Sequence, residues 1–169
     1  GYSGLYTALK ASDLMKLVDD GTAVVEFHLA SPRSWAWVVT STAVHGVLLP
    51  DRDLIEPVAR GLHAHFAAMK LGPPPQAEEL SRLVLTPLSP HLTAKRLVIV
   101  ASGALHGVPW RMLPLSGGSN RGRTARLIDD YEIEELPSLS TVGAIRELVA
   151  GRARPTRGIA VIADPVFDT

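Results

Sequence analysis

One apolar run, Arg96 to Ala101 (RLVIVA), constrains the fold of this chain more than any other feature. Successive side chains of a strand point to opposite faces of a sheet, so an unbroken apolar run indicates a strand that is buried on both faces. Such strands are typical of parallel sheets covered by helices. A second run of this kind, Gly158 to Ala163, indicates another buried strand. The sequence therefore predicts an α/β fold with a buried, mostly parallel sheet.

The residues before Arg96 predict a β-meander followed by helices. Three runs rich in apolar, aromatic and β-branched residues are separated by short turns, which indicates antiparallel strands; they are residues 23–29, 35–40 and 44–49. Apolar residues then recur every three or four positions, which indicates amphipathic helices, at 51–70 and 76–88. Gly72 to Pro75 lies between them as a proline-rich, stiff linker. A further helix is expected at residues 5–18.

The residues after Ala101 predict an alternation of strands and helices. We expect a mobile loop at 116–126, which is rich in glycine, serine and arginine, and no helix at 126–130. A strand is expected at 131–136 and a helix, capped by Ser138, through residue 149. The chain then stops six residues after the expected strand at 158–163, where an α/β fold places its functional edge. We therefore expect the chain to be part of a longer protein.

Charge and cysteine content narrow the classes of function. The chain has 17 basic and 17 acidic residues, so its zero net charge gives no reason to expect nucleic acid or a membrane surface as a partner. It has no cysteine, which excludes thiol chemistry within these residues and favours a reducing, cytoplasmic location. No apolar run approaches the length of a membrane helix.

Two motifs suggest chemistry but lack its context. Residues 117–124 (GGSNRGRT) nearly match the phosphate-binding pattern GxxxxGK[ST], but proline precedes them and no helix is expected to follow. Ser102 follows the strongest strand, as a nucleophile would, but Val100 stands where that motif needs glycine. His106 is near Ser102 in sequence and has no evident orienting acid. We expect a solvated loop and a tight turn, respectively.

Other polar and aromatic residues favour structural roles. The histidines do not form a zinc-binding pattern, and His63 and His65 point to different sides of a helix. We therefore expect no metal and no cofactor. Six arginines are expected on a solvated surface or against an acidic peptide: Arg121, Arg123, Arg126, Arg152, Arg154 and Arg157. Three tryptophans are expected to be core or interface anchors: Trp35, Trp37 and Trp110.

The order of these segments resembles the CHAT domain, a caspase-like peptidase domain related to separase and often attached to TPR repeats. The resemblance covers residues 12–169, and two segments carry most of it. They are the strand with its continuation GALHGVPW at 103–110, and YEIEELPSLS at 131–140. The resemblance implies a caspase-like or pseudo-caspase α/β sandwich. Ser102 departs from it, since the family more often has aspartate there.

In the family, the catalytic histidine and cysteine follow the segment that resembles Asp164 to Phe167, so the resemblance implies that both lie downstream of this chain. His106 and Gly107 belong to the earlier segment and do not inherit the catalytic role. No catalytic, cofactor-binding or metal-binding residue is therefore expected here. Residues 1–20 would be a helical lead-in from an upstream, TPR-like region, and residues 21–169 the N-terminal part of a CHAT domain.

The resulting hypothesis is that the chain is the supporting, non-catalytic portion of a cysteine endopeptidase that acts on proteins. Its expected partners are the downstream catalytic half, upstream TPR-like repeats or a regulatory protein, and a protein substrate, with no nucleic acid or membrane. Two alternatives stay open. One is a catalytically inactive CHAT-like interaction scaffold, and the other is an α/β domain that binds a nucleotide or another small molecule through residues 117–124.

Overall fold

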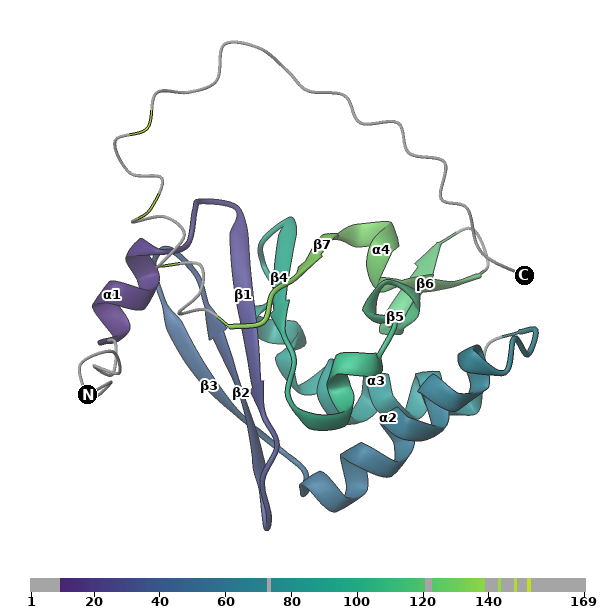
Figure 1. Cartoon of the computed structure of the whole chain (residues 1–169). Coiled ribbons are helices and arrows are strands. Elements are labelled where there is room, and N and C mark those ends of the chain that lie inside the picture. The colour runs from purple at the N-terminus through teal and green to yellow at the C-terminus, as the bar shows by residue number, and fades with distance from the viewer. Residues whose placement is uncertain are drawn as a thin grey trace.

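A single five-stranded sheet organises the structure, which is a computed structural model (Figure 1). The structure describes residues 10–72, 74–120 and 123–138, together with the single residues 143, 148 and 152. The strands lie in the order β3-β2-β1-β4-β7. The first strand of the chain is therefore in the middle of the sheet.

The meander forms as its sequence predicts. β1 (Thr22–His28), β2 (Ser34–Val39) and β3 (Val44–Leu49) pair antiparallel through short turns. β4 (Arg96–Val100) then pairs parallel to β1, and β7 (Glu132–Glu135) pairs parallel to β4. β2 alone runs against the other strands, so the meander and the parallel strands share one sheet. This confirms the expected α/β class with a mostly parallel sheet.

Helices α2 (Arg52–Ala67) and α3 (Pro75–Val84) cover one face of this sheet, as predicted (Figure 1). The side chains that alternate inward from β1, β2 and β4 form one core with the apolar stripes of the two helices. Gly72 has a φ of +88°, which glycine adopts easily, and Pro75 is among the first residues of α3. Gly72 therefore lies between two helices that pack on each other, the second of which begins at Pro75.

The opposite face of the sheet has a smaller core. It consists of Val18, Val24, Val39, Val98 and Val100, with Leu14, Val44 and Leu136 packed against it. Helix α1 (Ala11–Lys16) lies on this side, across the sheet from α2 and α3 (Figure 1). The expected helix at 5–18 is thus present over its second part, and its beginning lies outside the described residues.

A small second sheet corrects the expected loop at 116–126. β5 (Pro114–Asn120) and β6 (Arg123–Arg126) pair antiparallel, with proline tolerated because it is the first residue of its strand. The short helix α4 (Leu127–Asp130) follows, although the sequence did not predict it. The Asp129 carboxylate accepts a hydrogen bond from the Arg126 backbone N–H at 2.9 Å, which satisfies a donor that the helix start leaves free.

Three 3₁₀ helices complete the described residues: η1 (Thr86–His91), η2 (Gly103–Gly107) and η3 (Trp110–Met112). η1 continues the second predicted helix in a tighter form. The strand expected at 158–163 lies outside the described residues. Most of the helix expected at 138–149 also lies outside them. Of that range, Ser138 is described without regular structure, and Gly143 and Leu148 are described as helical.

Candidate functional site

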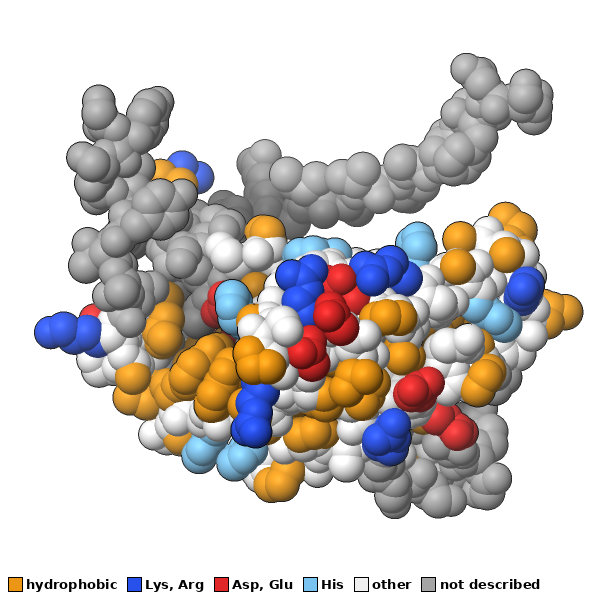
Figure 2. Space-filling view, turned by 90° about the horizontal axis from the view of Figure 1, so that it is seen from below, with side chains coloured by type: hydrophobic (Ala, Val, Ile, Leu, Met, Phe, Trp, Pro, Cys, Tyr) orange, Lys and Arg blue, Asp and Glu red, His pale blue; other side chains and the backbone are white. Residues whose placement is uncertain are grey.

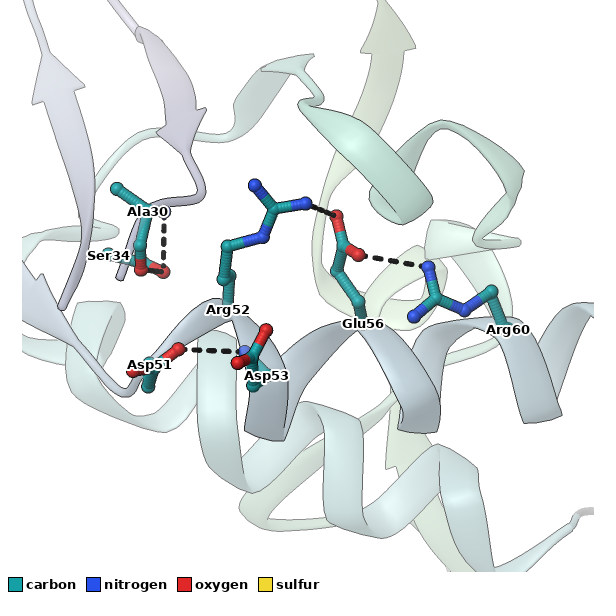
Figure 3. A network of polar contacts seen from close by, with 7 residues as sticks. All are labelled: Ala30, Ser34, Asp51, Arg52, Asp53, Glu56 and Arg60. Carbon is teal, nitrogen blue, oxygen red and sulfur yellow. Dashed lines mark hydrogen bonds and ion pairs between the residues drawn. The ribbon is translucent and has the colours of Figure 1, made fainter. Parts of the chain in front are cut away.

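The edge of the sheet where β1 and β4 end is a candidate site, because α/β folds place functional groups at the carboxyl ends of their strands. Helix α2 begins beside this edge, where the Asp51 carboxylate accepts a hydrogen bond from the Asp53 backbone N–H at 2.8 Å (Figure 3). Acidic and basic side chains gather near the middle of the molecule when it is seen from below, with hydrophobic side chains around them (Figure 2).

Glu56 is the buried member of a three-residue ion network on α2. Arg60 donates a hydrogen bond to one carboxylate oxygen at 2.9 Å, and Arg52 donates to the other at 3.3 Å (Figure 3). The hydrogen bond from Arg60 is the main reason that the pKa of Glu56 is lowered, with the charges of both arginines adding to it against the effect of burial. Glu56 is therefore ionised at neutral pH and is a poor proton acceptor.

The Glu56 carboxylate lies against the turn that follows β4. A Cβ atom at Gly103 would lie 2.6 Å from Glu56 Oε1, and Gly103 also has a φ of +55°. At the other end of the same turn, Nδ1 of His63 lies 3.2 Å from the Gly107 carbonyl oxygen. A Cβ at Gly107 would lie 3.0 Å from that nitrogen. Glycine at both ends thus lets η2 lie directly on α2.

The residues after these contacts anchor the turn in the core. Leu105 and Trp110 are fully buried, and Val108 is nearly so. Trp110 stacks on Phe27 of β1, with ring centroids 5.1 Å apart. The segment GALHGVPW is therefore a structural element that ties the end of β4 to α2 and β1. These contacts explain why β4 and the glycines and apolar residues that follow it act as one structural element.

Ser102 and His106 do not form a nucleophile and base. Ser102 precedes η2 in an extended conformation, and its side chain does not cap the helix. A 3₁₀ turn follows it, whereas a nucleophile elbow needs a longer helix. The His106 side chain is exposed and has no hydrogen bond among the described residues. The prediction of a tight turn is confirmed.

The described residues of the segment 117–124 do not have the geometry of a phosphate-binding loop. That geometry requires the residues after the last glycine to begin a helix. Arg123 and Thr124 instead lie in β6, paired with β5. The nucleotide hypothesis therefore loses the local structure on which it depended.

The six histidines do not gather in one cluster. His45 of β3 stacks on His91 at the end of η1, with centroids 4.2 Å apart. His65 contacts the Gly72 carbonyl oxygen at 3.1 Å, away from His63. Among the residues described, no group of three or more histidine, aspartate or glutamate side chains could hold a metal ion.

Three of the six arginines expected to form a patch are among the described residues. Arg126 donates a weak hydrogen bond to the sulfur of Met112 at 3.8 Å. Arg152 is exposed, and Arg123 belongs to β6. The others, Arg121, Arg154 and Arg157, lie outside the described residues.

The tryptophans divide between core and surface. Trp110 is in the core, whereas Trp35 and Trp37 are 41% and 44% exposed and stack on each other with centroids 6.1 Å apart. They lie on the sheet face opposite to α2, because the intervening Ala36 and the following Val38 point into the main core. The face of the meander that α2 and α3 cover is thus the one without tryptophan.

A pocket of about 430 Å³ opens on this tryptophan face, between the meander and α1. Its lining is mostly apolar and includes Leu14, Trp37, Val39 and Val44. Glu26 and His28, which alternate outward from the core face of β1, are its ionisable residues. Burial raises the pKa of Glu26, and the charge of His28 partly opposes this.

The sequence alone does not indicate this pocket. The alternation in VEFHL at 25–29 placed Glu26 and His28 on one face of a strand, and Trp35 and Trp37 share a face in the same way. The missing information was the register, in which Glu26 lies directly opposite Trp37. Only that pairing brings a carboxylate and an indole together.

A mixed, mostly parallel sheet with helices, continued by a buried turn after its central parallel strand, defines an α/β domain of the caspase-like type. Comparison with protein families identifies the group: the model of the CHAT domain matches residues 74–169, more than half of the chain. The chain therefore belongs to the CHAT domain family, a family of caspase-like peptidases. No curated protein matches it. Within the described part of the chain, no helix is both long and apolar enough to span a membrane.

Proposed function

We propose that this chain is the supporting, non-catalytic portion of a CHAT-type cysteine endopeptidase that cleaves proteins. The observation that supports this most is the role of residues 103–110. This segment is one of the two that carry most of the family resemblance, and it is built as a structural anchor, with Gly103 and Gly107 against α2 and Trp110 in the core. It holds the sheet edge in shape.

The chemistry of the family requires a thiolate as nucleophile and a histidine as its base. The 169 residues contain no cysteine. The proposal therefore assigns the catalytic histidine and cysteine to residues downstream of Thr169, which would extend or pack against this sheet. β7 is at one edge of the sheet as far as the structure describes it, with β4 on its inner side.

Upstream TPR-like repeats or a regulatory protein are the second proposed partner. Three apolar side chains near the end of α2 are exposed, and Met112 lies close to two of them around a pocket of about 220 Å³; the three are Phe66, Met69 and Leu71. Exposed apolar groups concentrated at one helix end fit contact with another protein.

Comparison of two proteins tests the proposal: the 169-residue chain and the full product of the gene that encodes it. Each is incubated with casein, with and without iodoacetamide. We expect cleavage by the full product alone, abolished by iodoacetamide and by replacing the downstream cysteine with alanine. A full product that carries no cysteine-dependent activity would favour the inactive scaffold. Cleavage by the 169-residue chain would contradict the proposal.

A further inference from the structure

The pocket between α1 and the meander combines features that a structural role does not explain. Trp35, Trp37 and Leu48 each expose about two fifths of their surface on this face. They are neighbours, because Trp35 pairs with Leu48 across the strands and stacks on Trp37. Clustered aromatic surface beside a pocket is typical of a binding site for another molecule.

The pocket contains a carboxylate without a partner. Glu26 is half-buried, and among the described residues no side chain donates a hydrogen bond to it or forms an ion pair with it. On the same strand face, His28 acts on it only through space. Removing a carboxylate from water is unfavourable unless a cation or donors compensate. An occupant that brings a positive charge would supply that compensation.

The indole of Trp37 is held beside this carboxylate in a fixed position. A Cβ atom at Gly46, its neighbour on β3, would lie 2.7 Å from the Trp37 ring. Glycine therefore lets the indole lie over β3, and the residue remains 44% exposed. An indole face attracts a cation and also packs against an aliphatic chain.

We propose that this groove binds a lysine or arginine side chain presented by a protein partner. The apolar walls from Leu14, Val39 and Val44 would contact the aliphatic stem, and the cation would reach Glu26 with Trp37 alongside. Charge complementarity favours this occupant over a purely apolar segment or a second copy of the chain, because neither brings a cation to Glu26. The inference does not depend on the proposed peptidase function.

Two capped tripeptides serve as probes, one with lysine between two leucines and one with norleucine in its place. Indole N–H signals in ¹H–¹⁵N NMR spectra, assigned by Trp35→Phe, Trp37→Phe and Trp110→Phe, report on binding. We expect the lysine peptide to shift the Trp37 signal and to bind about fivefold or more tightly than the norleucine peptide. The Trp110 signal should not move, because that ring is in the core.

Two variants give the decisive comparison. Glu26→Gln should reduce lysine binding to the norleucine level, whereas Glu134→Gln, an exposed carboxylate on the same sheet face, should leave it unchanged. Gly46→Ala should weaken binding by displacing the indole, and it serves if Glu26→Gln fails to fold. Equal affinity for both peptides, lysine binding that survives Glu26→Gln, no shift at all, or a concentration-dependent dimer that buries Trp37 would each overturn the proposal.

Discussion

The carboxylate of Glu56 occupies the space that a side chain at Gly103 would need, with Oε1 only 2.6 Å from the position of a Cβ atom. One residue is in the middle of an ion network on α2, and the other begins the turn after β4. The contact therefore joins the helical layer to the edge of the sheet where β4 ends. A substitution at either residue should therefore disturb the structure around both.

Gly103→Ala should lower the free energy of unfolding by about 2–4 kcal/mol. The left-handed backbone disfavours alanine by about 1–2 kcal/mol, and the clash with Glu56 adds to this. Gly21→Ala is the matched control, since Gly21 has a φ of +79° but no atom within 4 Å of a Cβ. Gly21→Ala should lower the free energy of unfolding by about 1 kcal/mol, because only the cost of the left-handed backbone applies there. Urea unfolding measures both, and equal losses would rule out the steric contact.

Glu56 should make the protein sensitive to acid. Its pKa is lower in the folded state than in the unfolded state, so its ion pairs stabilise the fold above the ordinary carboxylate range. That contribution is lost as the pH falls through the lowered value. Glu56→Gln should be less stable than the parent at pH 7, and this difference should shrink toward pH 3. Thermal unfolding across this range checks it, and a difference that is constant with pH would contradict the assignment.

Glu26 should affect stability in the opposite direction to Glu56, so that its contribution is most favourable in acid. Burial raises its pKa, so the folded state holds the proton more tightly than the unfolded state does. The free energy of unfolding should therefore fall as the pH rises from about 4 through the raised value. Glu26→Gln removes this fall and should be the more stable protein at pH 7. Direct titration of the Glu26 side chain by NMR gives the pKa, and an ordinary value would contradict the expectation.

Thr22 offers a test of a buried hydroxyl. Its Oγ1 is buried and has no hydrogen-bond partner in the part of the chain that the structure describes. Thr22→Val should therefore stabilise the protein by about 1 kcal/mol, because the change removes an unsatisfied polar group and keeps the shape. Thr40→Val should destabilise it, since the Thr40 hydroxyl accepts from the Ala43 backbone N–H at 3.0 Å. Denaturant unfolding measures the change in the free energy of unfolding for both variants. Changes of the same sign would contradict the view that hydrogen bonding of the hydroxyl decides the effect of removing it.

The region that matches the family model begins at residue 74 and so includes only part of the sheet. β4 follows residue 74, but its neighbour β1 and the helix that covers both precede it. We expect residues 74–169 alone to show no cooperative thermal transition by circular dichroism, because Leu97 and Ile99 would lose their covering residues. Residues 10–169 should unfold cooperatively. A cooperative transition of the shorter fragment would place the boundary of the folding unit at residue 74.

The sequence predicted most strands and helices because their periodicity is local. The buried strand at Arg96 and the stripe of α2 needed no knowledge of their partners. The hairpin at 114–126 was missed because glycine, serine and arginine are weak strand formers and their pairing decides the outcome. The contact between Glu56 and Gly103 joins residues far apart in the chain, and so does the pairing of β1 and β4. No local pattern specifies such contacts.

The central position of β1 sets the timing of folding during synthesis. β2 and β3 are made directly after it, so one edge of β1 is paired early. The partner of its other edge comes much later, since Thr22 pairs with Arg96. At about 5–20 residues per second, the ribosome leaves that edge open for several seconds. Unpaired strand edges template aggregation. The nascent chain is therefore most vulnerable in the interval before α2, α3 and β4 have emerged.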